Sequence, residues 1–211
     1  MGTCCYIAGA GEFVDDELPE RGDYIIAADA GYVELVSRGI APDLLIGDFD
    51  SLGNIPEHPN IIRSPAEKDD TDMMLAVKQG MALGFRTFII NGGLGGRLDH
   101  TLANTQLLAY IAKSGARGIL LGRDMCATAI TNGAARFKSR ASGLISVFSA
   151  GGTAEGVTLS GLKYMLDKAT LTCDYPIGVS NEFIGKPATI AVDAGTLIIM
   201  WTGKLGDFND D

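Results

Sequence analysis

The chain has 211 residues, of which 46% are hydrophobic and 20% are charged, and its net charge at pH 7 is −9. This composition is typical of a globular protein with enough apolar side chains for one large domain or two small ones. No run of lysines and arginines offers the basic surface that a phosphate backbone requires, so we expect no nucleic-acid partner.

No apolar stretch is long enough to span a bilayer, and no secretion signal follows Met1, so we expect no membrane partner. The four cysteines form no Cys-x-x-Cys pair, and the chain has only two histidines, which argues against a zinc site. Free thiols fit a reducing compartment, and we expect a cytoplasmic protein.

Short apolar segments alternate with helical ones in the first half of the chain. Their patterns predict strands at residues 3–8, 24–28, 44–46, 87–90 and 119–121, and helices at residues 32–37, 71–83 and 101–113. In the middle helix Met74, Val77 and Met81 form one apolar stripe. Strands that alternate with helices predict an α/β fold with a doubly wound, mostly parallel sheet.

The rhythm changes after Asn132-Gly133, where short alternating segments recur between glycine, asparagine and aspartate residues. They predict strands at residues 144–148, 157–159, 169–173, 188–192 and 196–201, and none is long enough for a helix. This half is predicted to be an antiparallel β-sandwich or barrel. We therefore divide the chain into an α/β domain, residues 1–135, and an all-β domain, residues 136–211.

Two aspartates directly follow the predicted strand at residues 44–46. In Gly47-Asp48-Phe49-Asp50-Ser51 they lie two residues apart, so on an extended chain both point the same way. Ligands bind at the carboxyl ends of the strands in open α/β sheets. A pair of aspartates in a loop is, by itself, more often a solvated turn.

A third acid changes that balance. Asp72 lies in the first turn of the predicted middle helix, with Asp69 and Thr71 among the possible N-caps. One acid suffices for capping and for the helix dipole, so several invite a second explanation. Asp72, Asp48 and Asp50 are hard oxygen ligands and together predict a Mg²⁺ site.

A glycine-rich stretch, Gly92-Gly93-Leu94-Gly95-Gly96-Arg97, follows another predicted strand. It is not a Walker loop, because the Gly-Lys-Ser/Thr ending is absent, and an arginine at the helix entrance argues against a dinucleotide fingerprint. Its N–H groups can approach phosphate, and Arg97 is a forked donor to phosphate oxygens. Together with the acids, the loop predicts that the cation carries a polyphosphate.

Asp99, His100 and Asn104 follow this loop at the start of the next predicted helix. Asp99 either caps the helix or contacts a ribose or base, and the two interpretations are evenly balanced. His100 and Asn104 lie one helical turn apart on one face, as a structural hydrogen-bonding pair or a catalytic one.

Two features of the second half also have more than one interpretation. Gly178-Val179-Ser180-Asn181-Glu182 interrupts the alternation with small polar residues, and Trp201, the only tryptophan, ends the last predicted strand. Each feature alone is more often turn chemistry or core packing.

Together these residues resemble the thiamine pyrophosphokinase family over nearly the whole chain. The motifs that carry the resemblance are, in chain order, Gly47-Asp48-Phe49-Asp50-Ser51, Asp69-x-Thr71-Asp72, Gly95-Gly96-Arg97-x-Asp99-His100 with Asn104, Gly161-Leu162-Lys163-Tyr164 and Gly178-x-Ser180-Asn181-Glu182. The resemblance implies an α/β domain that binds ATP and Mg²⁺, a β-sandwich domain that binds thiamine, and a homodimer with active sites near the subunit interface. It also implies pyrophosphoryl transfer from ATP to the hydroxyl of thiamine, with release of AMP.

The resemblance implies roles for single residues as well. Asp48, Asp50 and Asp72 resemble the family's catalytic, Mg²⁺-organising acids. The nucleotide contacts that it implies are Asp29, Ser51, Thr71, Gly92, Gly93, Arg97 and Asp99. Ser180 and Asn181 are similar to the family's thiamine contacts, and Trp201 is similar to a tryptophan that stacks on thiamine.

Two other functions fit part of the pattern. A phosphatase of the haloacid dehalogenase type also places Asp-x-Asp after a strand, with the first aspartate as a covalent nucleophile. The threonine that follows the second acid there is absent here, where Ser51-Leu52 stands. A thiamine or nucleotide sensor without catalysis is the other alternative, and it would not need three unneutralised acids.

Overall fold

The computed structural model describes residues 4–49, 57–63 and 69–209. The chain forms two compact units, Met1–Asn104 with Leu120–Arg123, and Thr105–Ile119 with Asp124–Asp211. The division falls inside helix α3 (Leu98–Lys113) and strand β6 (Arg117–Leu120). The boundary expected between an α/β domain ending at residue 135 and an all-β domain starting at residue 136 stays a prediction.

The first unit contains a parallel sheet. Its strands lie in the order β5-β1-β2-β3-β4 and are β1 (Cys5–Ala8), β2 (Tyr24–Ala28), β3 (Leu44–Gly47), β4 (Ile61–Arg63) and β5 (Thr87–Asn91). All the pairs between these neighbours are parallel. Each residue of β1 and β3 is buried, as expected for parallel strands that are covered on both faces.

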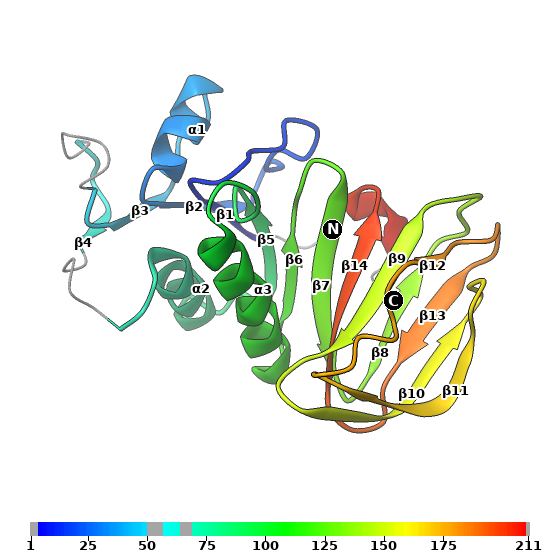
Figure 1. Cartoon of the computed structure of the whole chain (residues 1–211). Helices are drawn as coiled ribbons and strands as arrows, with labels where there is room; N and C mark the ends of the chain where they lie inside the picture. Colours follow the sequence, from blue (N-terminus) through cyan, green and yellow to red (C-terminus); the bar gives the residue numbers. More distant parts are fainter. Residues whose placement is uncertain (1–3, 50–56, 64–68, 210–211) are drawn as a thin grey trace. The chain divides into compact units, whose positions relative to one another are not determined.

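Two helices cover this sheet. Helices α1 (Gly31–Ser37) and α2 (Asp72–Ala82) both contact β1 and β2, and Figure 1 shows them on opposite sides of these strands. The predicted doubly wound α/β arrangement is therefore confirmed. Among the described residues, no helix is long and apolar enough to cross a membrane.

The buried face of α2 differs from the predicted stripe. Met73, Ala76, Val77 and Gly80 are buried, whereas Met74 and Met81 are partly exposed. A Cβ atom at Gly80 would lie 2.6 Å from the ring of Phe88, so the helix approaches the sheet closely there. The missing side chain of Gly80 thus turns the contact face by about one residue.

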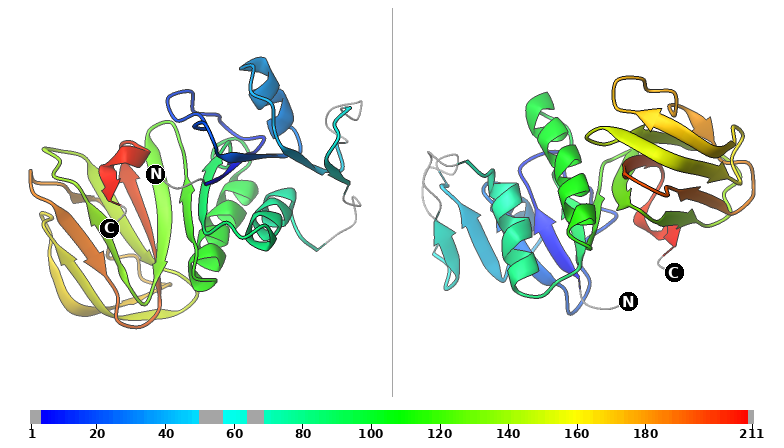
Figure 2. Two further views of the ribbon diagram at one scale, coloured as in Figure 1. Left: turned by 180° about the vertical axis from the view of Figure 1, so that it is seen from behind. Right: turned by 90° about the horizontal axis from the view of Figure 1, so that it is seen from below.

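The second unit contains two layers of antiparallel strands. One has the order β12-β9-β14-β7, with β7 (Met125–Thr131), β9 (Leu144–Ser149), β12 (Asn181–Glu182) and β14 (Thr196–Thr202). The other has the order β11-β10-β13-β8-β15, with β8 (Ala134–Phe137), β10 (Thr153–Ser160), β11 (Leu166–Thr172), β13 (Ala188–Ala191) and β15 (Phe208–Asn209). The two sheets form two layers in Figure 2.

Aromatic side chains fill the space between these two layers. Trp201 of β14 meets Phe137 of β8 edge-on at 5.2 Å between ring centroids and stacks on Phe208 of β15 at 5.9 Å. Contacts of this kind join the inner faces of two sheets, as in a sandwich. The all-β prediction is confirmed as a sandwich rather than a barrel.

Candidate active site

The carboxyl ends of β1, β2, β3 and β5 meet at one edge of the parallel sheet. Ala8 of β1 is paired with Ala27 of β2 and with Asn91 of β5, and Ala28 is paired with Ile46 of β3. The segments that leave these strands therefore start side by side, at the carboxyl edge where α/β proteins bind ligands.

The loops after β1 and β5 are joined by their backbones. The N–H of Gly9 donates to the carbonyl of Asn91 at 2.7 Å, and that of Gly11 donates to the carbonyl of Gly92 at 2.7 Å. A Cβ atom at Gly9 would lie 2.6 Å from the oxygen of Gly92, and one at Gly92 would lie 2.4 Å from the oxygen of Gly9. Only glycine permits this close approach of the two backbone segments.

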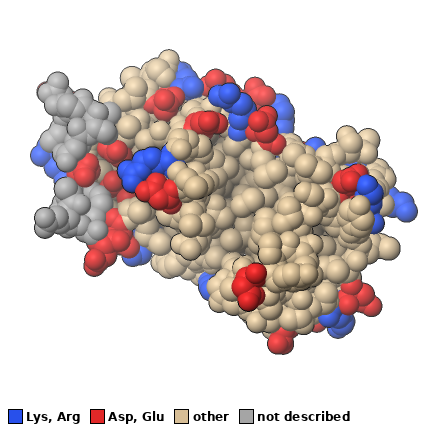
Figure 3. Space-filling model, viewed as in Figure 1, with Lys and Arg blue, Asp and Glu red and all other residues tan. Residues whose placement is uncertain are grey.

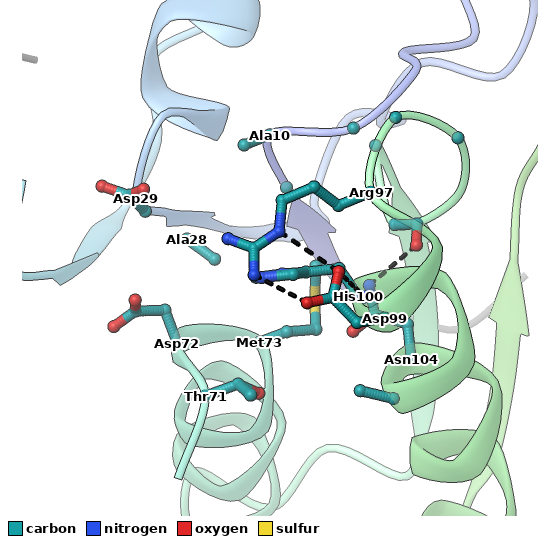
Figure 4. A pocket seen from close by; sticks show the side chains of 17 residues that line it. Ala10, Ala28, Asp29, Thr71, Asp72, Met73, Arg97, Asp99, His100 and Asn104 are labelled. Atoms are coloured by element: carbon teal, nitrogen blue, oxygen red, sulfur yellow. Dashed lines mark hydrogen bonds and ion pairs between the residues drawn. The ribbon is translucent and has the colours of Figure 1, made fainter. Parts of the chain in front are cut away.

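A cleft of about 550 Å³ opens at this edge. Figure 4 shows the side chains that surround it. Its lining residues come from the loops after β1, β2 and β5 and from the starts of α2 and α3: Gly9, Ala10, Gly11, Ala28, Asp29, Thr71, Asp72, Met73, Gly92, Gly93, Gly95, Gly96, Arg97, Asp99, His100, Ala103 and Asn104. The predicted site residues Asp29, Thr71, Asp72, Gly92, Gly93, Arg97 and Asp99 are thus brought together.

Two acids lie on one side of the cleft. Figure 4 shows Asp29 and Asp72 there, with Asp99 on the other side and the guanidinium of Arg97 between them in this view. Asp29 has a φ of +48°, a left-handed conformation that costs free energy for a residue other than glycine. Strain of this kind recurs at functional sites, which is consistent with a role for the Asp29 carboxylate in the cleft.

Thr71 places Asp72 at the start of α2. The Thr71 hydroxyl accepts a hydrogen bond from the N–H of Met74 at 3.1 Å, which makes Thr71 the N-cap among the candidates in the sequence. Asp72 is consequently the first residue of the helix. A carboxylate at this position is favoured by the helix dipole, so the helix stabilises the charge that Asp72 presents to the cleft.

Arg97 and Asp99 form a two-bond ion pair at the other side of the cleft. Arg97 Nε lies 3.1 Å from Asp99 Oδ1, and Arg97 Nη2 lies 2.7 Å from Oδ2. The hydrogen bond from Arg97 lowers the pKa of the Asp99 carboxyl from 3.8 to about 2. Both side chains are exposed, at 72% and 65%, so their contribution to folding stability is small.

The start of α3 shows what Asp99 and Asn104 do within the fold. The carbonyl of Arg97 accepts the hydrogen bond of the Thr101 N–H at 3.1 Å, so the helix begins at Leu98 and Asp99 is inside its first turn rather than its N-cap. Asn104 donates from Nδ2 to the carbonyl of Gly93 at 2.7 Å. Asn104 therefore connects the helix to the glycine loop. Its side-chain amide bonds to this loop and not to His100.

The two predicted thiamine contacts of the second unit, Asn181 and Ser180, differ in how exposed they are. Asn181 is buried, and its side-chain amide holds both backbone groups of Tyr164: Oδ1 accepts from the N–H at 2.9 Å and Nδ2 donates to the carbonyl at 2.6 Å. Ser180 is exposed and has a φ of +60°. Tyr164 is 58% exposed beside these residues in the sandwich.

The prediction that Trp201 stacks on thiamine conflicts with its position. Trp201 is 0% exposed, packs against Phe137 and Phe208, and donates from Nε1 to the carbonyl of Lys204 at 3.2 Å. An indole whose faces are covered by the core has no face for a ligand. The position of Trp201 supports the other interpretation of this residue, which is core packing.

Comparison with known proteins identifies the family. Two family models match the chain, "Thiamin pyrophosphokinase, catalytic domain" over residues 16–120 and "Thiamin pyrophosphokinase, vitamin B1 binding domain" over residues 136–197. The thiamine pyrophosphokinase of Bacillus subtilis is 30% identical over 182 residues, which cover 83% of this chain and 85% of that protein. This chain belongs to the thiamine pyrophosphokinase family.

Solved structures of thiamine pyrophosphokinases agree with this membership. The crystal structure of the Bacillus subtilis protein has a TM-score of 0.83 at 27% identity and covers 96% of this chain and 100% of that one. That of the Geobacillus thermodenitrificans protein has a TM-score of 0.79 at 26% identity and covers 97% of this chain and 100% of that one. These likenesses favour neither the phosphatase nor the sensor.

Only part of the predicted Mg²⁺ site lies in the cleft. Asp72 lines it, Asp48 follows β3 and is not among the lining residues, and Asp50 and Ser51 lie outside the described residues. Within the described residues, no three acidic, histidine or cysteine side chains form a cluster that would hold a metal alone. Mg²⁺ is commonly held by one or two carboxylates plus substrate phosphates, so this donor set fits an ion that arrives with the nucleotide.

One lining residue of the cleft was missed in the sequence. It is Met73, which follows Asp72 in α2 and whose side chain points into the cleft in Figure 4. The loop at Gly9, Ala10 and Gly11 was recognisable as glycines after a predicted strand. Tyr164, in the second unit, stood in a motif of the thiamine pyrophosphokinase family without a role of its own.

Proposed function

We propose that the cleft at the carboxyl ends of β1, β2 and β5 binds the ATP that this member of the thiamine pyrophosphokinase family uses. The enzyme transfers a pyrophosphoryl group from ATP to the hydroxyl of thiamine, and the products are thiamine diphosphate and AMP. The single observation that carries the assignment is the cleft itself, in which a glycine-rich loop and Arg97 face Asp29 and Asp72. Backbone N–H groups and an arginine recognise phosphates, and carboxylates recognise the accompanying cation.

The acids are assigned to the metal and to the reacting phosphates. We propose that Asp48, Asp50 and Asp72 hold Mg²⁺ and are the catalytic acids. When bound, the ion would neutralise the charge of the phosphates during transfer. One of the carboxylates also accepts the proton of the thiamine hydroxyl, because a primary alcohol is a weak nucleophile until its proton leaves.

The remaining groups of the cleft position the nucleotide. Arg97 neutralises phosphate oxygens through its guanidinium fork, while Gly92 and Gly93 allow the backbone to approach them. Asp29, Ser51, Thr71 and Asp99 complete the proposed nucleotide contacts. Because Asp99 occupies the fork of Arg97, phosphate either replaces this carboxylate or binds to the guanidinium edge that the carboxylate leaves open.

The thiamine site is proposed to lie in the β unit around Ser180 and Asn181. Thiamine carries a flat cationic ring and a polar aminopyrimidine, so it requires an aromatic face and small hydrogen-bonding groups. We assign the aromatic face to Tyr164 instead of Trp201, because Tyr164 is exposed and is held in place by Asn181. Asn181 then acts through Tyr164, and Ser180 offers its hydroxyl.

A homodimer with active sites near the subunit interface is part of the proposal. Apolar side chains are exposed on the β unit at Met165, Ile177 and Val179. In Figure 3 the charged side chains of this unit lie in separate groups with uncharged surface between them. Such a surface suits association with a second copy. The free cysteines of the chain fit the reducing cytoplasm as the place of the reaction.

A direct assay tests the proposed function. Protein, ATP, Mg²⁺ and thiamine are mixed, and the products are separated by chromatography. AMP and thiamine diphosphate in equal amounts are expected. ADP with thiamine monophosphate would refute pyrophosphoryl transfer, and phosphate release with an aspartyl-phosphate trapped on Asp48 would support the phosphatase instead.

A further inference from the structure

A buried asparagine stands directly behind the nucleotide cleft. Asn91, the last residue of β5, is 0% exposed and precedes Gly92 and Gly93 of the cleft wall. Its side chain makes hydrogen bonds to groups far away in the sequence. Oδ1 accepts from the N–H of Val14 at 2.9 Å, and Nδ2 donates to the carbonyl of Val14 and to the hydroxyl of Tyr6, each at 2.8 Å.

The network continues through Tyr6 to the far end of the loop that follows β1. The Tyr6 hydroxyl donates to the carbonyl of Glu17 at 2.9 Å. Burial raises the pKa of this phenol, so the hydroxyl keeps its proton and remains a donor. Asn91 and Tyr6 thus hold a segment without helix or strand, residues 12–17, at two points.

The residues directly before this segment form one wall of the cleft. Gly9 and Gly11 line the cleft and donate to the carbonyls of Asn91 and Gly92, and the N–H of Glu12 donates to the carbonyl of Leu94 at 2.8 Å. Asn91 is therefore bonded by its backbone to one end of this loop and by its side chain to the middle of it. These bonds join the loop after β1 to the loop after β5.

We propose that Asn91, supported by Tyr6, is a positioning residue for nucleotide binding, which holds the loops after β1 and β5 in the arrangement that receives ATP. The inference rests on the assignment of ATP to this cleft. Asn91 does not reach the cleft surface and acts through Gly9, Gly11, Gly92 and Gly93. Such support behind a binding group commonly decides how well the group functions.

The test uses three variants that remove different numbers of buried hydrogen bonds. Asn91→Leu removes all three side-chain bonds and keeps the branching of the side chain, with methyl groups that are larger than the amide atoms they replace. Tyr6→Phe removes the two bonds of the hydroxyl while both Asn91–Val14 bonds remain. Thr128→Val is the matched control. The Thr128 hydroxyl is buried and donates to the carbonyl of Gly118 at 2.7 Å in the second unit, so its loss destabilises the fold away from the cleft.

The measurements separate positioning from stability. For each variant we would determine the melting temperature, the KM for ATP and for thiamine, and the Kd of Mg²⁺-bound α,β-methylene-ATP, in which the reacting bond is blocked. Asn91→Leu is expected to raise the Kd and the KM for ATP on the order of tenfold or more, as misplacement of binding groups does, and to leave the KM for thiamine unchanged. Tyr6→Phe is expected to raise them less, and Thr128→Val to change only the melting temperature.

Hydrogen exchange gives a readout of the loops themselves. The amides of Gly11 and Glu12 are expected to exchange faster in Asn91→Leu, and the analogue at saturating concentration should restore their protection. Unchanged Kd and KM for ATP in folded Asn91→Leu, with a lower melting temperature as in Thr128→Val, would overturn the positioning role. If Asn91→Leu does not fold, Tyr6→Phe with an unchanged Kd has the same consequence. If the unaltered protein protects no amide of these loops when the analogue binds, the cleft assignment is wrong and the inference falls with it.

Discussion

Arg97 donates two hydrogen bonds to the carboxylate of Asp99, two residues further along the chain, with Nη2 2.7 Å from Oδ2 and Nε 3.1 Å from Oδ1. The only guanidinium that lines the described cleft is thus already engaged in an ion pair. Both side chains are largely exposed, so water and an incoming phosphate can compete for the same bonds. The pair orients the fork of Arg97 before the nucleotide arrives.

The fork of Arg97 is expected to matter more than its charge. Arg97→Lys keeps the charge but loses the planar pair of donors, so we expect the KM for ATP to rise roughly tenfold or more as a charge-assisted bond is lost. The KM for thiamine should not change. Steady-state kinetics with each substrate varied in turn make the comparison. Arg123→Lys, at an exposed position outside the lining residues, is the control; unchanged ATP kinetics in Arg97→Lys would make Arg97 structural.

Asp99 should titrate at unusually low pH. Its carboxyl pKa is lowered from 3.8 to about 2 by Arg97, so the ion pair is fully present above pH 3.8 and is lost as the pH falls through about 2. An NMR titration of the carboxyl carbons is expected to show this midpoint. In Arg97→Gln, which removes the charge and the fork, the midpoint should move back toward 3.8. The same midpoint in both proteins would contradict the pairing in solution.

The metal-organising acids should be necessary for turnover and dispensable for folding. Asp72→Asn is expected to lower kcat by about two orders of magnitude or more, by analogy with the loss of other electrostatic groups, because the amide cannot offset the phosphate charge. Asp48→Asn should behave alike. Turnover is measured by AMP release, and circular dichroism confirms folding.

Asp167→Asn is the control for these acid variants, because Asp167 is exposed on β11 in the other unit. It should retain full turnover. A well-folded Asp72→Asn protein with normal turnover would remove Asp72 from the catalytic acids.

Tyr164 and Trp201 are expected to respond in opposite ways. Tyr164→Leu should raise the KM for thiamine roughly 2- to 30-fold, for a cation–π contact worth about 0.5–2 kcal/mol, with little change in stability since the ring is exposed. Trp201→Phe should leave this KM unchanged and lower the free energy of unfolding by roughly 1–3 kcal/mol, because the side chain is part of the core. Tyr175→Leu, at another exposed tyrosine of the same unit, is the control. The reverse pattern would restore Trp201 to the thiamine site.

Mixed dimers test whether two subunits build each site. Inactive Asp48→Asn protein is combined with inactive Ser180→Ala/Asn181→Ala protein under conditions that allow subunit exchange. Sites shared between subunits predict recovered activity, since half of the sites in a mixed dimer are intact. If mixed dimers are demonstrated by mass spectrometry and stay inactive, each site lies within one chain.

Local features of the chain were predictable from the sequence. The strands that end at Ala8, Ala28 and Asn91 were found within a residue or two, because burial on both faces of a parallel sheet produces continuous apolar runs. Thr71 was among the N-caps considered, since capping depends on a residue three positions away. The exact face of α2 was not predictable, because the position of Gly80 matters only against Phe88 on another element.

The sequence by itself determined the class of each half, the grouping of Asp72 with the glycine loop and Arg97 in one expected site, and the family to which the chain belongs. These follow from short-range periodicity and from motifs in a fixed order. Only the tertiary structure decided that Trp201 is core and that Tyr164 is exposed, since exposure depends on what packs over a residue from elsewhere. It likewise decided that Asn91 bonds to Tyr6, 85 residues away, because a hydrogen-bond partner at that separation leaves no trace in local pattern.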